Sequence, residues 1–414
     1  MRRRVVVTGI GSVSPFGLGL EPLWDAVLEG RSGMVPITSF DVSEYPTRFA
    51  AEIRDFDAEQ LMDPKQAKRS DRCTQFAVVA SDLALRDSGF SITPDNADRV
   101  GVLIGSGIGG MHTWEEQFER LLTRGPMKIS PFFVPMMIIN MSSGMVSMIT
   151  GAKGPNTAVV TACASGTHAL GDATEIIRRG AADVMIAGGS EAAIVRCALA
   201  GFCRAGALSR RNDDPTRACK PYDIDRDGFV MGEGATVMIL EAAEAAVARG
   251  AHIYGEIAGY GMSGDAHHMT DPDPEGLGPM RAMRAALADA GEDLQAVGYI
   301  NAHAPGTQAG DDIEAKAIRL LFGDQADVTP VSSTKPVHGH QLGATGATEL
   351  AVCLRTLETG LIPASLNSVN IDPACRVNVV QGEPLAADVR VAMSNSFGFG
   401  GHNAVLVARR FEQA

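Results

Sequence analysis

The sequence has few of the features that mark disulfide-stapled, zinc-binding or nucleic-acid-binding proteins. Its seven cysteines are scattered, odd in number and never spaced as CxxC pairs. That distribution argues against a disulfide framework or a zinc site and favours a reducing compartment. Acidic residues outnumber basic ones, and the net charge of −13 argues against nucleic acid as a partner.

Apolar runs long enough to cross a membrane are also missing. Val5–Val7 follow three arginines, as the apolar core of a signal peptide would, but Thr8 and Pro15 belong to a stretch that breaks the run early. We therefore expect a first core strand there. Residues 132–150 are apolar overall, yet Pro135 and several polar residues interrupt them. We expect a buried or dimer-face helix, no stable membrane insertion and a cytoplasmic protein.

What the chain does have is a regular alternation of strand-like and helix-like segments. Its 414 residues are 45% hydrophobic, and no linker or low-complexity tract divides them. This alternation predicts an α/β fold with mostly parallel sheets covered by helices. The pattern restarts after residue 241, so we expect a duplicated core with a boundary near residue 250. The expected strands are 5–9, 99–104, 157–160, 184–187, 237–241, 254–260, 299–302, 329–332 and 404–409, and the expected helices are 75–87, 169–179, 278–290, 313–322 and 342–359.

The most informative segment surrounds Cys163. A strand-like run at 157–160 leads into the small residues of Thr161–Gly166 and then into an expected helix. A thiol at a strand-to-helix turn meets free backbone N–H groups and the positive end of the helix dipole, and we expect these to favour a thiolate. A single cysteine is more often a buried small hydrophobe than a nucleophile. Its turn and its small neighbours set Cys163 apart from that rule.

Two histidines lie in equally unusual settings. His303 belongs to Asn301-Ala302-His303-Ala304-Pro305-Gly306-Thr307, and His340 ends Lys335-Pro336-Val337-His338-Gly339-His340. A cysteine together with two histidines predicts nucleophilic acyl chemistry. Residues 394–403 surround two phenylalanines with glycines and serines. We expect a loop there that presents backbone N–H groups while its aromatic rings close a cavity.

Three other motifs suggest cofactors, and each lacks a required part. Gly105–Gly110 fits GxGxxG, but no second strand ending in an acid follows at the spacing of a dinucleotide site. Residues 223–228 open like a calcium loop, but Gly234 stands where the bidentate glutamate belongs. His267-His268 has no third metal ligand at useful spacing. We expect ordinary turns and loops at these places and no nucleotide or metal site.

Taken together, four motifs in order resemble the β-ketoacyl-acyl carrier protein synthases, and most closely the elongation synthases of type II fatty-acid synthesis. The resemblance covers nearly the whole chain and implies a thiolase fold, a duplicated five-layer α-β-α-β-α core assembled as a homodimer. Residues 1–250 would carry the nucleophile, and residues 251–414 would carry both histidines and a gating loop. The four motifs are Thr161–Gly166, Asn301-Ala302-His303, Ser333-Thr334-Lys335 with Gly339-His340, and Asn395–Gly401.

The resemblance also implies an activity. Cys163 would take an acyl chain from acyl carrier protein as a thioester. Malonyl-carrier protein would then be decarboxylated and condensed with that chain, with His303 and His340 stabilising the enolate. The backbone N–H groups of Cys163 and Phe399 would hold the acyl oxyanion. Neither a metal nor a redox cofactor would take part, because the substrates arrive on the phosphopantetheine arm of the carrier protein.

Further roles follow from the same resemblance. Lys335 and Glu349 would orient the histidines and tune their charge state. The glycine-rich loop would act as a gate together with a second loop at 264–272, and residues 132–148 would complete the acyl pocket, partly from the second subunit. Exposed cations would dock the acidic carrier protein, although on charge alone they equally fit a solvated helix face. The residues implied are Gly398, Phe399, Gly400 and Gly401 for the gate, Ile108, Phe133 and Phe202 for the acyl pocket, Thr270 and Thr307 for pantetheine, and Lys65, Lys68, Arg69, Arg72, Lys128 and Arg204 for docking.

The chain departs from the usual family pattern near both histidines. Pro305 stands where a hydroxyl residue is usual, and Pro336 and His338 replace the usual Ser and Thr. Activity is expected because the catalytic residues are intact, but these changes put the substrate in question. A ketosynthase of a type II polyketide, polyene or other specialised acyl pathway is therefore the alternative to fatty-acid elongation. A thiolase would have a second reactive cysteine where Gly400-Gly401-His402 stands, and a silent partner subunit would lack Cys163.

Overall fold

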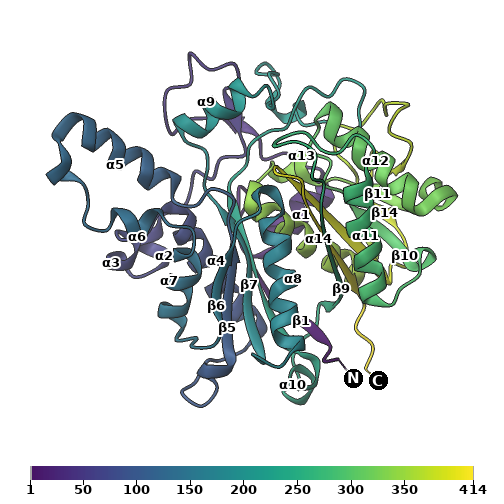
Figure 1. The fold of residues 1–414 in the computed structure, drawn as a ribbon, viewed down its shortest axis with the longest axis horizontal. Helices are drawn as coiled ribbons and strands as arrows, with labels where there is room; N and C mark the ends of the chain where they lie inside the picture. Colours follow the sequence, from purple (N-terminus) through teal and green to yellow (C-terminus); the bar gives the residue numbers. More distant parts are fainter. Residues whose placement is uncertain (1, 414) are drawn as a thin grey trace.

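A large sheet runs through the whole molecule with helices on both of its faces (Figure 1). The computed structural model describes residues 2–413, and within them this sheet has twelve strands. Their order is β13-β11-β10-β15-β16-β9-β1-β8-β7-β5-β6, with β2 paired to the side of β1. The strands are β1 (Val5–Ser14), β2 (Gly17–Leu18), β5 (Val100–Gly105), β6 (Asn156–Val159), β7 (Val184–Glu191), β8 (Gly234–Ala242), β9 (Gly255–Gly264), β10 (Val297–Asn301), β11 (Pro330–Ser332), β13 (Asn378–Val379), β15 (Val391–Gly398) and β16 (His402–Arg409).

Two short ribbons and a set of helices complete the fold. The ribbons pair β3 (Val35–Pro36) with β4 (Phe49–Ala50) and β12 (Leu361–Ile362) with β14 (Leu385–Ala386). The α-helices are α1 (Leu20–Glu29), α2 (Ala58–Leu61), α3 (Pro64–Ala67), α4 (Arg72–Ser88), α5 (Met111–Arg124), α6 (Phe133–Met137), α7 (Met141–Thr150), α8 (Ser165–Arg178), α9 (Arg196–Arg204), α10 (Ala243–Ala248), α11 (Leu277–Ala290), α12 (Gln308–Phe322), α13 (Lys335–His338) and α14 (Thr345–Thr359). The 3₁₀ turns are η1 (Ala97–Arg99), η2 (Pro126–Lys128), η3 (Ala162–Ala164), η4 (Pro215–Arg217), η5 (Leu294–Ala296), η6 (Gly323–Asp327) and η7 (Leu342–Ala344).

The two ends of the sheet repeat one topology. In the N-terminal half, β1 is antiparallel to β8, β8 is antiparallel to β7, β7 is parallel to β5, and β5 is parallel to β6. In the C-terminal half, β9, β16, β15, β10 and β11 repeat this order with the same directions. The halves join where β1 pairs with β9. The predicted duplicated α/β core is therefore confirmed, but the expectation of mostly parallel strands is wrong. The central strands β16, β9, β1 and β8 all pair antiparallel with their neighbours, and parallel pairing is confined to the two ends of the sheet. The division at residue 250 stays a prediction because the sheet is continuous across it.

Three hydrophobic clusters show how the helices cover the sheet. Helices α8 and α14 lie together in the middle, and their apolar faces share one cluster with strands of both halves (Figure 1). Helices α4 and α7 cover the outer face of the N-terminal half, and α11 with α12 covers the outer face of the C-terminal half. Because side chains of a strand point alternately to its two faces, Val184 and Ile186 of β7 pack outward while Met185 and Ala187 pack inward. The N-terminal and C-terminal parts of the sheet thus enclose the central helices, and each part carries a helix layer on its outer face. This gives the five α-β-α-β-α layers expected of the thiolase fold.

Helices α8 and α14 begin in the same unusual way. Each follows a 3₁₀ turn, η3 or η7, whose first residue has a left-handed backbone, with φ of 50° at Ala162 and 48° at Leu342. Non-glycine residues adopt this conformation rarely and at an energetic cost. The strain recurs at the two places where the chain enters the central layer, and the first of them carries Cys163.

Two further sequence-based expectations were wrong in detail. Residues 394–398 belong to β15, which pairs with β16 in a hairpin, so only the segment around Phe399–Gly401 is a turn. The buried Ser394 and Asn395 face the protein interior, and small polar residues there concealed the strand pattern. Residues 132–150 form two short helices, α6 and α7, because the chain bends between them. No helix within residues 2–413 has the length and apolar character needed to span a membrane.

Candidate active site

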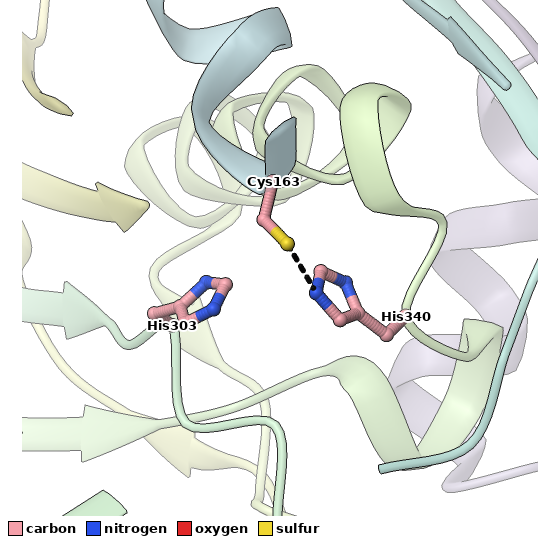
Figure 2. Close-up of side chains that lie close together, drawn as sticks. All are labelled: Cys163, His303 and His340. Carbon is pink, nitrogen blue, oxygen red and sulfur yellow. Dashed lines mark hydrogen bonds between the residues drawn. The ribbon is translucent and has the colours of Figure 1, made fainter. Parts of the chain in front are cut away.

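The side chains of Cys163, His303 and His340 lie close together (Figure 2), and all three line one cavity. The cavity has a volume of about 520 Å³, and its exposed lining is mostly apolar. Cys163 comes from the N-terminal half, whereas both histidines come from the C-terminal half. The predicted residues Ile108, Phe202, Thr270, Thr307, Gly398, Phe399 and Gly401 also line this cavity.

The chain around Cys163 is fixed by close backbone packing. Cys163 lies in η3, between β6 and α8, and 9% of its surface is exposed. The turn of the gate segment presses against it, since a Cβ at Gly398 would lie 2.7 Å from the Thr161 carbonyl oxygen and 3.1 Å from the Cys163 nitrogen. A glycine at position 398 thus allows the backbone N–H groups near Cys163 and Phe399 to lie beside the sulfur, where both lower the pKa of its thiol.

His340 is held against the thiol from two sides. Its Nε2 lies 3.0 Å from Sγ of Cys163, and its Nδ1 lies 3.0 Å from Oγ1 of Thr345 in the first turn of α14. The ring of Phe229 packs edge-on against the imidazole, with 5.2 Å between the ring centroids. The imidazole can therefore exchange a hydrogen with the sulfur without reorienting.

His303 is anchored through its backbone. Oε1 and Oε2 of the buried Glu314 accept hydrogen bonds from the N–H groups of His303 and Ala304, at 2.9 and 2.7 Å. The Lys335 ammonium donates to the His303 carbonyl, and it also forms a fully buried ion pair with Glu349 at 2.5 Å. The His303 ring lies edge-on to that of His340, with 5.3 Å between centroids. Its Nδ1 is buried and has no hydrogen-bond partner among residues 2–413.

Burial dominates the electrostatics of the three side chains. It raises the pKa of the Cys163 thiol to about 12, against smaller lowering effects from Lys335 and backbone N–H groups. The expected resting thiolate is therefore wrong: desolvation outweighs the helix end. Burial and the Lys335 ammonium together lower the pKa of both His303 and His340 well below 6.5. At neutral pH the site holds a thiol and two neutral imidazoles.

Two buried glutamates organise the site, and sequence analysis missed both. Glu191 ends β7 and accepts from Oγ of Ser106 at 2.9 Å and from the backbone N–H groups of Gly107 and Gly343 at 2.7 and 3.0 Å. It thus ties the Gly105–Gly110 turn to the C-terminal half and excludes a phosphate cradle there. Glu314 lies on the buried face of α12. The sequence did carry a signal for both glutamates: Glu191 follows an apolar strand-like run, and Glu314 lies among apolar residues of a helix, where an acid is unusual.

Some implied residues lie away from the cavity. Phe133 in α6 and Gly400 do not line it. Lys65 lies in α3 and Lys68 caps its C-terminus, where Lys68 forms an ion pair with Glu59 at 3.0 Å. The guanidinium of Arg69 lies 4.5 Å from the centre of the Phe132 ring. Lys128 ends η2 and Arg204 ends α9, and both are exposed.

Arg72 differs from the other implied docking residues. Its guanidinium donates to Glu233 at 2.8 Å and to the Ile53 carbonyl at 2.5 Å, and it lies over the ring of Phe76. These contacts hold the N-terminus of α4 to the core and leave only 23% of the side chain exposed. We therefore assign Arg72 to the fold and leave it out of a docking surface.

The three active-site donors are also close enough to hold a metal ion. One donor atom each from Cys163, His303 and His340 lies within 4.8 Å of the others, and no further such group occurs within residues 2–413. The buried Lys335 ammonium opposes another cation at this place. The arrangement favours acid–base and nucleophilic chemistry over a metal centre.

The comparisons with known proteins agree with this geometry. Residues 2–246 match the model of the beta-ketoacyl synthase N-terminal domain, and residues 254–369 match that of its C-terminal domain. The chain therefore belongs to the β-ketoacyl synthase family, a family of condensing enzymes, and the resemblance predicted from its motifs is confirmed.

Individual relatives narrow the comparison further. The chain is 49% identical to a 3-oxoacyl-[acyl-carrier-protein] synthase 2 of Synechocystis sp., over 99% of both chains. A solved β-ketoacyl synthase from Burkholderia phymatum superimposes with a TM-score of 0.93 at 36% identity, covering 99% of this chain and 100% of the other. A type II polyketide ketosynthase solved with its acyl-carrier protein and described as bound to the hexaketide gives a TM-score of 0.91 at 32% identity, over 100% of both chains.

Proposed function

We propose that the protein condenses a malonyl group from malonyl-acyl carrier protein with an acyl group held on Cys163, releasing CO₂ and a β-ketoacyl-acyl carrier protein. The observation that carries this proposal is the meeting of Cys163, His303 and His340 at one largely apolar cavity. The relatives named 3-oxoacyl-[acyl-carrier-protein] synthase 2 favour fatty-acid elongation as the pathway.

The first half-reaction loads the acyl chain. Because the Cys163 thiol is protonated at rest, His340 accepts its hydrogen through Nε2 as the sulfur attacks the thioester carbonyl. The backbone N–H groups of Cys163 and Phe399 hold the developing oxyanion. The C–S bond to the carrier then breaks, and the departing thiolate takes up the proton.

The second half-reaction forms the carbon–carbon bond. Loss of CO₂ from the malonyl thioester leaves an enolate, whose oxygen accepts hydrogen bonds from N–H groups of the neutral His303 and His340. For this step the His340 hydrogen sits on Nε2, and the Thr345 hydroxyl donates to the bare Nδ1. The α-carbon attacks the acyl-Cys163 carbonyl, the C–S bond breaks, and the Cys163 thiolate takes up one proton from solvent, which is the proton that the overall reaction consumes. Burial, together with the Lys335 ammonium that pairs with Glu349, lowers the pKa of both histidines and keeps them neutral. The step requires neither metal nor redox cofactor.

Two loops at the cavity mouth act together as a gate in this scheme. The N–H of Gly400 donates to the Met269 carbonyl at 2.8 Å, and the N–H of Asp265 donates to the Gly401 carbonyl at 3.0 Å. The loop at 264–272 therefore moves with the turn that presents Phe399 to Cys163. Phe399 is 37% exposed and lines the cavity, as a gating side chain would. Thr270 and Thr307 lie along the same wall, where they would contact the pantetheine arm.

The protein acts on a carrier protein and as a homodimer in this proposal. A neighbouring polyketide ketosynthase was solved in complex with its acyl-carrier protein, and Lys65, Lys68, Arg69, Lys128 and Arg204 offer exposed cations for an acidic partner. In the part of the chain that the structure describes, the edge strand β6 has a paired strand on one side only, and α7 beside it leaves Met148 63% exposed. A second copy covering this edge would bring Phe133 toward the acyl pocket. Seven free cysteines support a cytoplasmic location.

A specialised acyl pathway remains the second candidate, because Pro305 lines the cavity where a hydroxyl is usual and a structural neighbour is a polyketide ketosynthase. Incubation with acyl- and malonyl-carrier proteins, followed by mass spectrometry of the carrier, tests the proposal. We expect a carrier-bound chain longer by one CH₂CO unit, and none with Cys163→Ala. A panel of acyl groups distinguishes fatty-acid elongation from a specialised pathway, because the two pathways differ in which acyl chains are extended. Hydrolysis of the thioesters without extension would contradict condensation.

A further inference from the structure

The segment that ends in His340 holds another buried histidine, which the proposed reaction does not use. His338 has no exposed surface and lies in α13, three residues after Lys335 and two before His340. Both of its ring nitrogens have partners. Nδ1 lies 2.8 Å from the Gly339 carbonyl oxygen, and Nε2 lies 2.9 Å from Oγ1 of Thr334.

These partners fix which nitrogen carries the hydrogen. A carbonyl oxygen can only accept, so Nδ1 of His338 donates to Gly339. Nε2 then has a free lone pair and accepts from the Thr334 hydroxyl. Burial and the neighbouring Lys335 ammonium lower the pKa of His338 to about 3, which agrees with a neutral ring. His338 is therefore a neutral hydrogen-bond donor with one defined orientation.

The carbonyl it holds belongs to the peptide unit that leads into His340. Because that unit is planar, its carbonyl and the His340 N–H rotate together. The N–H donates to the Val230 carbonyl at 2.8 Å, so both ends of the peptide unit are hydrogen bonded. Gly339 has a φ of 74°, and a Cβ there would lie 2.8 Å from Cβ of Ala51. The turn is tightly packed, so a small tilt of this peptide unit is passed on directly to the His340 side chain.

We propose that His338 is a positioning residue for His340, whose Nδ1–H fixes the peptide plane from which the His340 side chain projects toward Cys163. The inference rests on the proposed function of His340 and adds the group that holds it. Tilting this plane would carry Nε2 of His340 away from the sulfur, which lies 3.0 Å from it. A misplacement of about 1 Å can cost about a hundredfold in rate.

Two substitutions separate the two hydrogen bonds of His338. In His338→Asn the side-chain amide can replace Nδ1 as donor to Gly339, whereas in His338→Gln it reaches the position of Nε2 and contacts Thr334. We expect His338→Gln to lower kcat about 10–100-fold with KM for malonyl-carrier protein unchanged. We expect His338→Asn to retain most of the wild-type kcat. Equal losses in both variants, or wild-type rates in both, would overturn the proposal.

A second measurement needs no condensation and so separates this inference from the proposed function. The rate of Cys163 alkylation by iodoacetamide, followed against pH, reports whether His340 still accepts the thiol hydrogen. We expect the profile of His338→Gln to move to higher pH and that of His338→Asn to follow the wild type. Unmoved profiles in both would assign His338 a structural role alone. If neither variant folds, ¹⁵N NMR of the wild-type imidazoles decides: an Nδ1–H form of His338 supports the proposal, and an Nε2–H form overturns it.

Discussion

Nε2 of His340 lies 3.0 Å from Sγ of Cys163, although 177 residues separate them in the chain. The pair joins the two halves of the fold, because η3 carries the thiol at the entry to α8 and the histidine precedes the matching entry to α14. Each half alone holds an incomplete site. The folded duplication thus brings a buried thiol, which is protonated at rest, within reach of a neutral base.

The pH dependence of decarboxylation tests the charge state of the histidines. Their N–H groups act in the neutral form, and their pKa values lie well below 6.5, so lowering the pH through 6.5 leaves them neutral. We expect the rate of malonyl-carrier decarboxylation to stay nearly constant between about pH 8 and pH 6 and to fall only below that range. A half-maximal rate near pH 6.5 would show that burial does not shift the two groups.

The buried Lys335–Glu349 pair predicts a stability effect with a defined pH dependence. Lys335→Met leaves the Glu349 carboxylate buried and unpaired, which lowers the free energy of unfolding by about 3–5 kcal/mol at high pH. The pKa of Glu349 is already raised to about 7 by burial, and losing the ammonium removes the group that lowers it. As the pH falls, Glu349 takes up a proton and the loss of stability shrinks.

Urea unfolding of Lys335→Met at two pH values measures this effect. Lys335→Met with Glu349→Gln is the matched control, because it removes both charges and restores most of the stability. We expect condensation to stay impaired in this control, since the ammonium no longer holds the His303 carbonyl. A pH-independent loss of stability in the single variant would contradict the pairing.

Charge reversal tests the docking surface. Changing Lys65 and Arg69 to Glu should raise KM for carrier-bound substrates and leave small thioester mimics nearly unaffected. Salt should weaken the wild-type interaction, because the Debye length is about 8 Å at physiological ionic strength. Lys153→Glu is the control, since Lys153 is exposed at the opposite end of β6 from Cys163. An equal loss of activity with carrier-bound substrates and with small thioester mimics would indicate damage to the fold, as would the same loss in Lys153→Glu.

We expect the side chain of Ile108 to determine which lengths of acyl chain the enzyme accepts. It lines the cavity and packs in one cluster with Cys163, Phe202 and Leu342. Ile108→Phe should exclude longer acyl chains and leave short ones reactive, because overpacking a tight cavity costs about 1–3 kcal/mol. Ile108→Leu keeps the volume and should retain the wild-type range. A uniform drop over all chain lengths would make Ile108 an ordinary core residue.

Local patterns allowed much of this structure to be predicted. Strand and helix periods located most elements. The local motifs pointed to Cys163, His303 and His340, and the resemblance added the lysine–glutamate pair. The strand β15 was missed because its buried Ser394 and Asn395 break the apolar pattern. The charge state of Cys163 was also wrong, since desolvation depends on how tightly distant segments pack around the sulfur. The roles of Glu191 and His338 depend on tertiary hydrogen bonds that no local pattern shows.

The division of labour between the thiol and the histidines is tested most directly by intact-protein mass spectrometry after incubation with acyl-carrier protein, together with a condensation assay. We expect His303→Ala to accumulate the acyl adduct on Cys163 while condensation falls about 10²–10³-fold. Cys163→Ala should show no adduct and no condensation. An acyl adduct formed at the wild-type rate in Cys163→Ala would contradict the account.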